Sequence, residues 1–306
     1  MELDIIQENQ GNYHRAVLLK ESVDAMNIQP DGVYVDVTMG ASGHTREILS
    51  RLTTGKLFSF DQDRDAWKNA PVDPKFTLIK ENFGDAKNWL RFHGVKKVNG
   101  LLADLGVSSH QFDTADRGFS FRFDGPLDMR MNHQSALTAS KVVNEYDVDA
   151  LIKIFRVYGE VEKPHVAAHK IVAARPVRTT QELIVALVGN EDWKEHHQFL
   201  AKVFQSLRIE VNQEMQVLEN LLTQLPDILV DGGRAVFISY HSLEDRMVKS
   251  FFRSGNIEDK QEKDFFGNLI RPLKPLNAKP ILPSAEEVEV NSRARSAKMR
   301  IAEKIG

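Results

Sequence analysis

Two nearby segments of the chain combine small residues with a carboxylate in a pattern that suits a nucleoside. The string from Met39 to His44 contains Gly40 and Gly43, and a glycine lets the backbone approach a ligand because it has no Cβ atom. Asp61 follows about 20 residues later, where a carboxylate can accept hydrogen bonds from both hydroxyls of a ribose. The glycines alone would also fit an ordinary turn between a strand and a helix. Together with Asp61 they predict a nucleoside-containing cofactor.

The spacing of the glycines narrows the type of cofactor. It is G-x-x-G, whereas dinucleotide-binding proteins carry G-x-G-x-x-G with the pyrophosphate at the start of the helix. We therefore expect one nucleoside and no pyrophosphate. This favours S-adenosylmethionine over a nicotinamide cofactor.

Asp104 is the next candidate for chemistry, because it ends a short apolar run that begins at Gly100. Two roles fit a carboxylate at the end of a strand in this position. It could hydrogen-bond the cofactor, or it could accept an N–H bond from a substrate amine and keep the nitrogen lone pair aimed at a methyl carbon. A carboxylate that only caps the following turn is the structural alternative.

Two further strings are rich in the polar residues that catalytic loops use. One spans residues 117–131 and includes Asp128, and the other spans residues 241–246 and includes His241 and Asp245. The second string could simply cap a helix with its serine and its two carboxylates. One histidine with carboxylates three and four residues away is a poor metal signature, so we expect no metal. The absence of cysteine also excludes thiolate zinc sites, disulfides and a cysteine nucleophile.

Short strands that alternate with helices must position these residues. Runs of β-branched and apolar residues predict strands at 33–37, 55–60, 76–79, 100–104 and 234–240. Residues 45–52 have helical spacing, and a helix can begin within 65–70. This alternation predicts an α/β fold with a doubly wound, mostly parallel sheet. In such a sheet the ligand lies outside the carboxyl ends of the strands.

The middle of the chain interrupts the alternation. No strand is predicted within residues 108–210, most of which have the spacing of successive helices. We therefore predict a discontinuous α/β domain of residues 1–107 and 211–306, with a mainly helical domain of residues 108–210 inserted into it. Within the second part of the α/β domain, a helix is predicted at 212–225, a turn at 231–233 and a long irregular excursion at 255–290.

Overall charge gives little support for binding of a nucleic acid, because the chain has a net charge of −3. A local cluster of basic residues near the end of the chain could still grip an RNA backbone, or it could be an ordinary solvated face. Its members are Arg293, Arg295, Lys298 and Arg300. The aromatic residues Phe119, Phe121 and Phe123 could support an unstacked base or pack in a core.

No targeting signal is visible at the start of the chain, and no uninterrupted apolar run reaches about 18 residues. We therefore expect a cytoplasmic protein that has no membrane partner.

The chain also resembles the bacterial 16S rRNA cytosine-N(4)-methyltransferase family, of the MraW type, along nearly its full length. Among the strings that carry the resemblance are VDVTMGASGHTREIL (35–49), LLADLGVSSHQFDTADRGFSF (101–121), FISYHSLEDRMVK (237–249) and NSRARSAKMR (291–300). The resemblance implies a class I, Rossmann-like methyltransferase fold with an inserted helical domain. It also implies methyl transfer from S-adenosylmethionine to the exocyclic N(4) amine of one cytidine in the decoding region of 16S rRNA, within the small ribosomal subunit. A homodimer is left open.

The resemblance also assigns roles to residues of this chain. The cofactor contacts would be Ser42, Gly43, His44, Asp61, Phe83, Asp104 and Gln111. Beyond the resemblance, we hypothesise that the nucleotide pocket is shaped by Asp128, Arg130, His241 and Asp245. Two positions depart from the family pattern, because Ser42 stands where the family usually has glycine and His110 replaces the usual proline before Gln111.

Two alternative functions remain open. Methylation of another nucleic acid would use the same cofactor residues, and only the resemblance argues against it. A non-catalytic factor that binds adenosylmethionine and associates with ribosomes is the alternative outside the enzyme class. The density of polar residues around Asp104 and His241 argues against such a factor.

Overall fold

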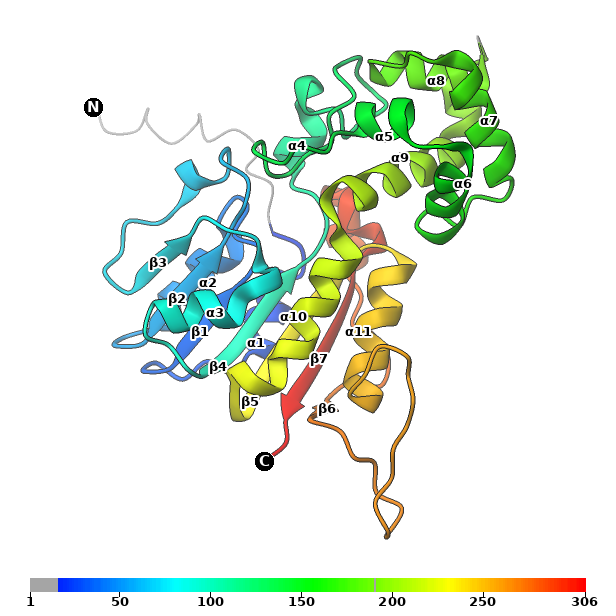
Figure 1. Ribbon diagram of the computed structural model, residues 1–306. Helices are drawn as coiled ribbons and strands as arrows, with labels where there is room; N and C mark the ends of the chain where they lie inside the picture. The colour runs from blue at the N-terminus through cyan, green and yellow to red at the C-terminus, as the bar shows by residue number, and fades with distance from the viewer. Residues whose placement is uncertain (1–15, 190) are drawn as a thin grey trace, which may run out of the picture.

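The computed structural model describes residues 16–189 and 191–306 (Figure 1). The expectation about a targeting signal therefore concerns residues that lie almost entirely outside the described ones. Seven strands form one sheet with the order β3-β2-β1-β4-β5-β7-β6. Their bounds are β1 Val33–Asp36, β2 Lys56–Phe60, β3 Phe76–Ile79, β4 Val98–Asp104, β5 Leu229–Ser239, β6 Leu273–Pro275 and β7 Lys298–Lys304.

Strands β1 to β5 pair in parallel, and only β7 runs antiparallel, between β5 and β6. The strand order reverses between β1 and β4, which is the position where doubly wound sheets bind ligands. The prediction of a class I methyltransferase fold with a mostly parallel sheet is confirmed.

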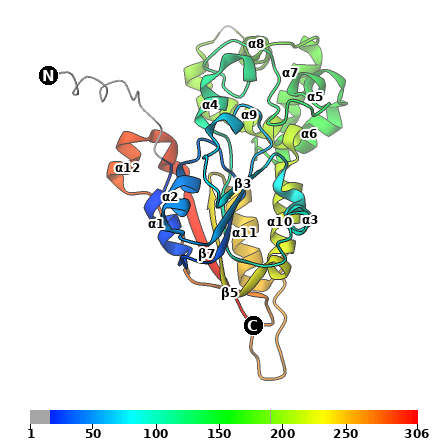
Figure 2. The ribbon, with the colours of Figure 1, turned by 90° about the vertical axis from the view of Figure 1, so that its left-hand side faces the viewer.

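Helices cover both faces of the sheet, which Figure 2 shows nearly edge-on. The helices α1 (Leu19–Ala25) and α2 (Gly43–Arg51) pack on one face, and α3 (Ala86–Phe92), α10 (Glu214–Ile228) and α11 (Ser242–Ser254) pack on the other. Neighbouring strand residues alternate between the two layers. In β4, for example, Leu101 packs with α10 and α11, whereas Leu102 packs with α1 and α2. Because both faces are buried, the strands are almost continuously apolar.

The predicted elements differ from the observed ones in several places, and strand β7 was not predicted at all, because residues 298–304 lie in the segment interpreted as a basic tail. The turn expected at residues 231–233 lies inside β5, because Leu229 already pairs with Val98 and the register then shifts, with Gly232 at a φ of 76°. The helix expected within 65–70 is a single 3₁₀ turn, Trp67–Asn69. The excursion at 255–290 contains the short strand β6 and the helix α12 (Ala285–Val290).

Between β4 and α10 the chain forms a layer of helices with its own hydrophobic core. These helices are α4 (Ser109–Asp113), α5 (Ala139–Glu145), α6 (Val148–Val157), α7 (Pro164–Ala174), α8 (Thr180–Val188) and α9 (His197–Asn212). The core extends from Phe119 to Val211, close to the predicted limits of the inserted domain, although those limits stay a prediction. Among the described residues, no helix is long and apolar enough to cross a membrane.

The aromatic loop before α5 contributes mainly to this helical core. Phe119 is buried, and the ring of Phe121 lies 5.6 Å from Trp193 and 5.3 Å from Phe204. Only Phe123 has an exposed side chain. The alternative in which these rings pack in a core therefore describes Phe119 and Phe121.

Arg300 does not belong to an exposed basic tail. It lies in β7 and is buried, and its guanidinium binds both oxygens of Asp245 at the start of α11, with Nε–Oδ1 and Nη2–Oδ2 distances of 2.6 and 3.1 Å. The expectation that Arg300 grips RNA was therefore wrong. Arg293 is also engaged, because it pairs with Asp113 and lies over the ring of Phe112. Arg295 remains exposed.

Replacing Arg300 by methionine should destabilise the fold by about 3 kcal/mol, because Asp245 would be left as a largely buried carboxylate with only Lys298 nearby. Urea unfolding of the wild type and R300M measures this change. The double variant R300M/D245L removes both charges and should recover most of the lost stability. Equal stability of the single and double variants would contradict this account.

Candidate functional site

The carboxyl ends of β1, β2, β4 and β5 meet at one edge of the sheet, and polar side chains follow each of them. Hydrogen bonds from the backbone N–H groups of these loops join them directly. The Gly40 N–H donates to Asp61 Oδ2 at 2.8 Å, and the Asp104 N–H donates to Thr38 Oγ1 at 2.7 Å. The structure therefore brings together the glycine string, Asp61 and Asp104, as the topology predicts.

The turn after β1 depends on two residues with left-handed backbone conformation. Gly40 has a φ of 51° and Ser42 has a φ of 66°. Glycine adopts this region without strain, which explains why a glycine suits position 42. The buried Ser42 hydroxyl donates to the Asn69 carbonyl at 2.7 Å, so its side chain is committed to the protein. A contact between Ser42 and a ligand would therefore use the backbone.

Gly43 is required by the fold itself. A Cβ atom at this position would lie 2.7 Å from the Cβ of Ala16, which is too close for any side chain. The glycine thus allows the start of α2 to pack against the segment before α1. Sequence reasoning assigned this residue to ligand approach and did not foresee the packing role.

Asp61 is held by two backbone donors. Its Oδ2 accepts from Gly40 and its Oδ1 accepts from the N–H of Asp63 at 2.9 Å. Burial raises the pKa of Asp61 to about 6, although these two hydrogen bonds favour the ionised form. A carboxylate oxygen has two lone pairs, so each oxygen can still accept from a hydroxyl.

Asp104 is held by side chains from two other elements. Tyr240, directly after β5, donates its hydroxyl to Asp104 Oδ1 at 2.7 Å, and His44 Nδ1 lies 3.7 Å from Oδ2. The other ring nitrogen of His44 lies 3.1 Å from the Val17 carbonyl oxygen. Burial raises the pKa of Asp104 to about 6, whereas His44 and the Tyr240 hydrogen bond act in the opposite direction.

Sequence reasoning missed Tyr240 and Asp36. Tyr240 was treated as the last residue of a predicted strand, and its position directly before His241 was the only signal of a role. Asp36 is fully buried at the end of β1 and accepts from the Thr45 hydroxyl at 2.6 Å, and burial raises its pKa. Both residues fix the surroundings of Asp104.

Gln111 lies at the start of the helical layer and is also fully engaged. Its Oε1 accepts from the Ser108 N–H at 2.9 Å, which completes a capping box at α4, and its Nε2 donates to Asp63 Oδ2 at 2.7 Å. The neighbouring His110 lies 3.2 Å from Asp65. These contacts hold the turn in the absence of the usual proline.

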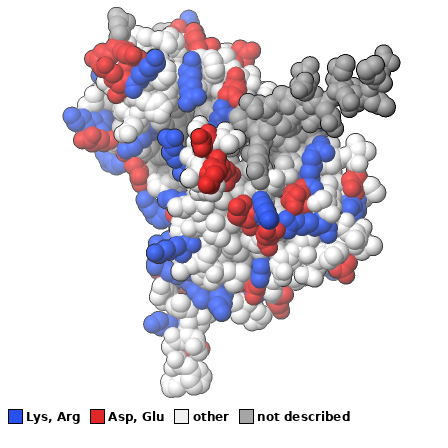
Figure 3. All heavy atoms as spheres, turned by 180° about the vertical axis from the view of Figure 1, so that it is seen from behind, with Lys and Arg blue, Asp and Glu red and all other residues white. Residues whose placement is uncertain are grey.

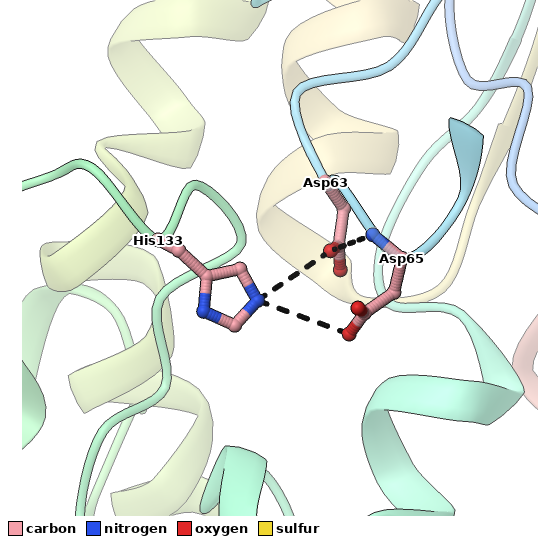
Figure 4. Close-up of side chains that lie close together, drawn as sticks. All are labelled: Asp63, Asp65 and His133. Carbon is pink, nitrogen blue, oxygen red and sulfur yellow. Dashed lines mark hydrogen bonds and ion pairs between the residues drawn. The ribbon is translucent and has the colours of Figure 1, made fainter. Parts of the chain in front are cut away.

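A cluster of charged residues surrounds this turn and was not predicted. Figure 4 shows Asp63 and Asp65, from the loop after β2, facing His133, whose Nε2 lies 3.8 Å from an oxygen of each. The buried Arg117 binds the same two carboxylates at 2.8 and 2.7 Å. Although burial opposes it, the Arg117 charge holds the pKa of Asp65 below its ordinary value. The cluster joins the helical layer to the edge of the sheet.

The residues predicted to shape a nucleotide pocket are held by their own neighbours. Asp128 binds the Arg130 guanidinium through both oxygens, at 2.8 and 2.7 Å. His241 caps α11, with its Nδ1 accepting from the N–H of Glu244 and its Nε2 3.2 Å from Glu244 Oε1. Asp245 faces Arg300, as described above. Their pocket role stays a prediction.

Phe83 lies in the 3₁₀ turn Phe83–Asp85 after β3. Its ring is partly buried against the core that α10 shares with the sheet, so part of it remains accessible next to the strand ends.

Comparison with known proteins identifies the family. A model of the MraW methylase family matches residues 11–305. The chain belongs to this family. Methylases of this family include proteins named ribosomal RNA small subunit methyltransferase H. The protein of that name from Bacteroides thetaiotaomicron is 54% identical over 306 residues, covering 98% of this chain and 100% of that protein. The one from Flavobacterium psychrophilum is 55% identical over 291 residues, covering 94% and 100%.

Two solved structures show a distant likeness to this MraW-family methylase. An rRNA methylase from Streptococcus thermophilus aligns with a TM-score of 0.41 and 12% identity, covering 94% of this chain and 95% of that one. TrmN from Thermus thermophilus aligns with a TM-score of 0.42 and 10% identity, covering 94% and 48%.

The raised pKa of Asp104 predicts a pH-dependent stability in this MraW-family methylase. A carboxyl that titrates near 6 when folded and near 3.8 when unfolded stabilises the fold below pH 3.8, and this stabilisation is lost as the pH rises through 6. Asparagine does not ionise. D104N should therefore gain about 2 kcal/mol of unfolding free energy relative to the wild type between pH 4 and pH 7. Urea unfolding of both proteins across this range measures the difference, and a constant difference would contradict the raised pKa.

Proposed function

We propose that this MraW-family methylase transfers a methyl group from S-adenosylmethionine to the exocyclic N(4) amine of one cytidine in the decoding region of 16S rRNA. The observation that carries the proposal is the placement of Asp61 and Asp104 as partly buried carboxylates on either side of the glycine turn after β1. Full-length relatives named ribosomal RNA small subunit methyltransferase H support the choice of RNA. We infer that the small ribosomal subunit in the cytoplasm is the substrate particle.

The residues at the strand ends fit adenosylmethionine. Asp61 keeps lone pairs for ribose hydroxyls, and the Ser42 hydroxyl is bound to the Asn69 carbonyl, so a contact from Ser42 would use its backbone. Phe83 offers an apolar ring for adenine, and Asp104 offers a negative charge for the methionine end. The proposed contacts are Ser42, Gly43, His44, Asp61, Phe83, Asp104 and Gln111.

Adenosylmethionine supplies a methyl group on a positively charged sulfur. The cytidine amine is a weak nucleophile because its lone pair is delocalised into the ring, and an acceptor for one of its N–H bonds makes the lone pair more available. We assign this acceptor to the Asp104 carboxylate or to the backbone that follows it. Tyr240 and His44 restrict the rotation of the carboxylate, which helps to align the reacting atoms. A carboxylate with a pKa near 6 can also take the proton that the amine loses and pass it to water.

In this proposal the nucleotide pocket is lined by the side chains of Asp128, His241 and Asp245. Each is oriented by a neighbour, namely Arg130, Glu244 and Arg300. The helical layer, which the Arg117 cluster joins to the sheet, would present the RNA to the strand ends.

Transfer of a labelled methyl group tests the proposed function. The acceptors are small ribosomal subunits and protein-free 16S rRNA, both from cells that lack this protein, and the labelled nucleosides are then analysed. We expect N(4)-methylcytidine. Label in another nucleoside would favour a different nucleic acid substrate. Binding of the cofactor without label in any RNA would favour a non-catalytic factor.

The hydrogen bond from Tyr240 predicts the pH dependence of the reaction. If the reaction needs ionised Asp104, kcat/KM should fall below a pH of about 6 in the wild type. Y240F removes a donor that favours the ionised form, so its acid limb should move to higher pH.

Y34F is the matched control for this measurement. Tyr34 is a buried tyrosine in β1 whose hydroxyl accepts from the Gln29 N–H, away from Asp104. Its substitution should leave the acid limb in place. An unchanged limb in Y240F would show that Tyr240 does not act through Asp104.

A further inference from the structure

A hairpin-like segment after α11 presents two phenylalanine side chains to solvent. Phe265 and Phe266 are 98% and 85% exposed, and their rings lie 5.7 Å apart at 86°. In Figure 1 this segment extends beyond the end of the sheet that lies opposite the helical layer. Two adjacent aromatic residues are rarely left in water without a function.

The turn that carries these two rings is well defined. The Asp264 carboxylate accepts from the N–H groups of Phe266 and Asn268 at 2.9 and 2.8 Å, and Gly267 has a φ of 86°. An antiparallel bridge joins Lys263 to Leu269 just below the turn. The rings are therefore held outward by local hydrogen bonds.

The base of the segment is fixed to the end of α11. Arg253 pairs with Asp259, and Asn256 exchanges hydrogen bonds with the backbone of Lys260 at 2.7 and 2.9 Å. Arg271 donates to the Arg253 carbonyl at 3.2 Å. The position of the aromatic tip thus follows the position of α11.

Basic side chains lead along α11 toward this tip. Arg246, Lys249 and Arg253 are spaced three and four residues apart and are all exposed, so they share one face of the helix, while the acidic residues of its first turn bind His241 and Arg300. Residues 246–274 contain seven Lys and Arg against four Asp and Glu, a net charge of +3 in a chain whose net charge is −3. Figure 3 shows Lys and Arg gathered on the flank above the tip.

We propose that the exposed face of α11 and the aromatic tip at Phe265 and Phe266 form a second RNA-binding surface of this protein. The basic face would contact phosphates, and the tip would stack on an unpaired base, because aromatic rings accept any base without regard to sequence. The proposal rests on the proposed function, since it takes the substrate to be a large RNA. It adds a contact remote from the target cytidine.

The direction and length of α11 set the distance between the strand ends, where the target cytidine would bind, and the aromatic tip. The helix begins at Ser242, directly after its capping residue His241 next to the strand ends, and its 13 residues extend away from them by about 20 Å before the segment begins. A short RNA that carries only the target cytidine would not reach the tip. A folded 16S rRNA would reach both.

The test compares two double variants and one single variant with the wild type. F265S/F266S removes the exposed rings, and K249Q/K263Q removes two exposed cations. F92S is the control, because Phe92 is also 78% exposed but lies at the end of α3. Binding to protein-free 16S rRNA and to small subunits is measured by filter binding at several salt concentrations, together with KM and kcat for methyl transfer.

We expect F265S/F266S to weaken binding to both forms of RNA about tenfold and to raise KM, with kcat unchanged. K249Q/K263Q should weaken binding and reduce the salt dependence of the dissociation constant. F92S should behave as the wild type. A wild type that labels no RNA would count against the proposed function, whereas the binding comparison would still test the surface.

Two results would contradict the proposed second RNA-binding surface. If F265S/F266S binds protein-free rRNA as the wild type does and loses affinity only for intact subunits, the tip contacts a ribosomal protein. If the variant equals F92S in every measurement, the tip has no part in binding the substrate.

Discussion

The removal of three carboxylates from water at the ends of β1, β2 and β4 is the constraint on which the rest of the site depends. A buried carboxylate is costly unless donors satisfy it. Asp36 is satisfied by Thr45, Asp61 by the backbone of the glycine turn, and Asp104 by Tyr240 with His44 nearby. These contacts connect the turn after β1 to α2, β2, β4 and the start of α11. The donors offset part of the cost, and the raised pKa values of all three carboxyls show that part remains.

The remaining free-energy cost of burying these carboxylates bears on which ligand the site binds. The Asp36 charge raises the pKa of both Asp61 and Asp104, so the three groups repel one another when ionised. A positively charged ligand at the strand ends would relieve this repulsion and favour the ionised forms. Adenosylmethionine carries such a charge on sulfur and another on its amino group. The electrostatics and the glycine turn therefore favour the same proposed ligand on independent grounds.

Several contacts attach the helical layer to this edge of the sheet. The buried Arg117 binds Asp63 and Asp65, and Glu160 pairs with Arg246 at the start of α11. A further attachment is the chain itself, where α9 passes into α10 through Gln213 in a left-handed conformation. The exposed pair with Arg246 contributes little to stability, whereas loss of the buried Arg117 would leave two carboxylates uncompensated.

How far the sequence predicts this structure depends on the range of the interactions involved. The strands β1 to β4 follow from local patterns of apolar residues, and their ends were predicted to within two residues. Strand β5 begins five residues earlier than predicted, and β6 and β7 were not predicted. A run of helices was predicted within residues 108–210, without bounds for the individual helices. The string Asp231-Gly-Gly233 has the composition of a turn. It lies inside β5 because Leu229, before it, already pairs with Val98 of β4. Tyr240 was missed because its partner lies 136 residues away. The Arg117 cluster was missed because Arg117 lies more than 50 residues from Asp63 and Asp65.

The distribution of charge reconciles a net negative protein with an RNA substrate. A small part of the negative charge lies inside, because Asp36 and Glu244 are buried and Asp61 and Asp104 are partly buried at the strand ends. Arg300, which was predicted to contact RNA, forms an ion pair with Asp245 instead. Of the exposed cations of α11, Arg246 and Arg253 pair with Glu160 and Asp259, and Lys249 lies on the same exposed face. Attraction to phosphates falls off within about 10 Å at physiological salt, so affinity depends on the charge of the local surface and not on the sum over the chain.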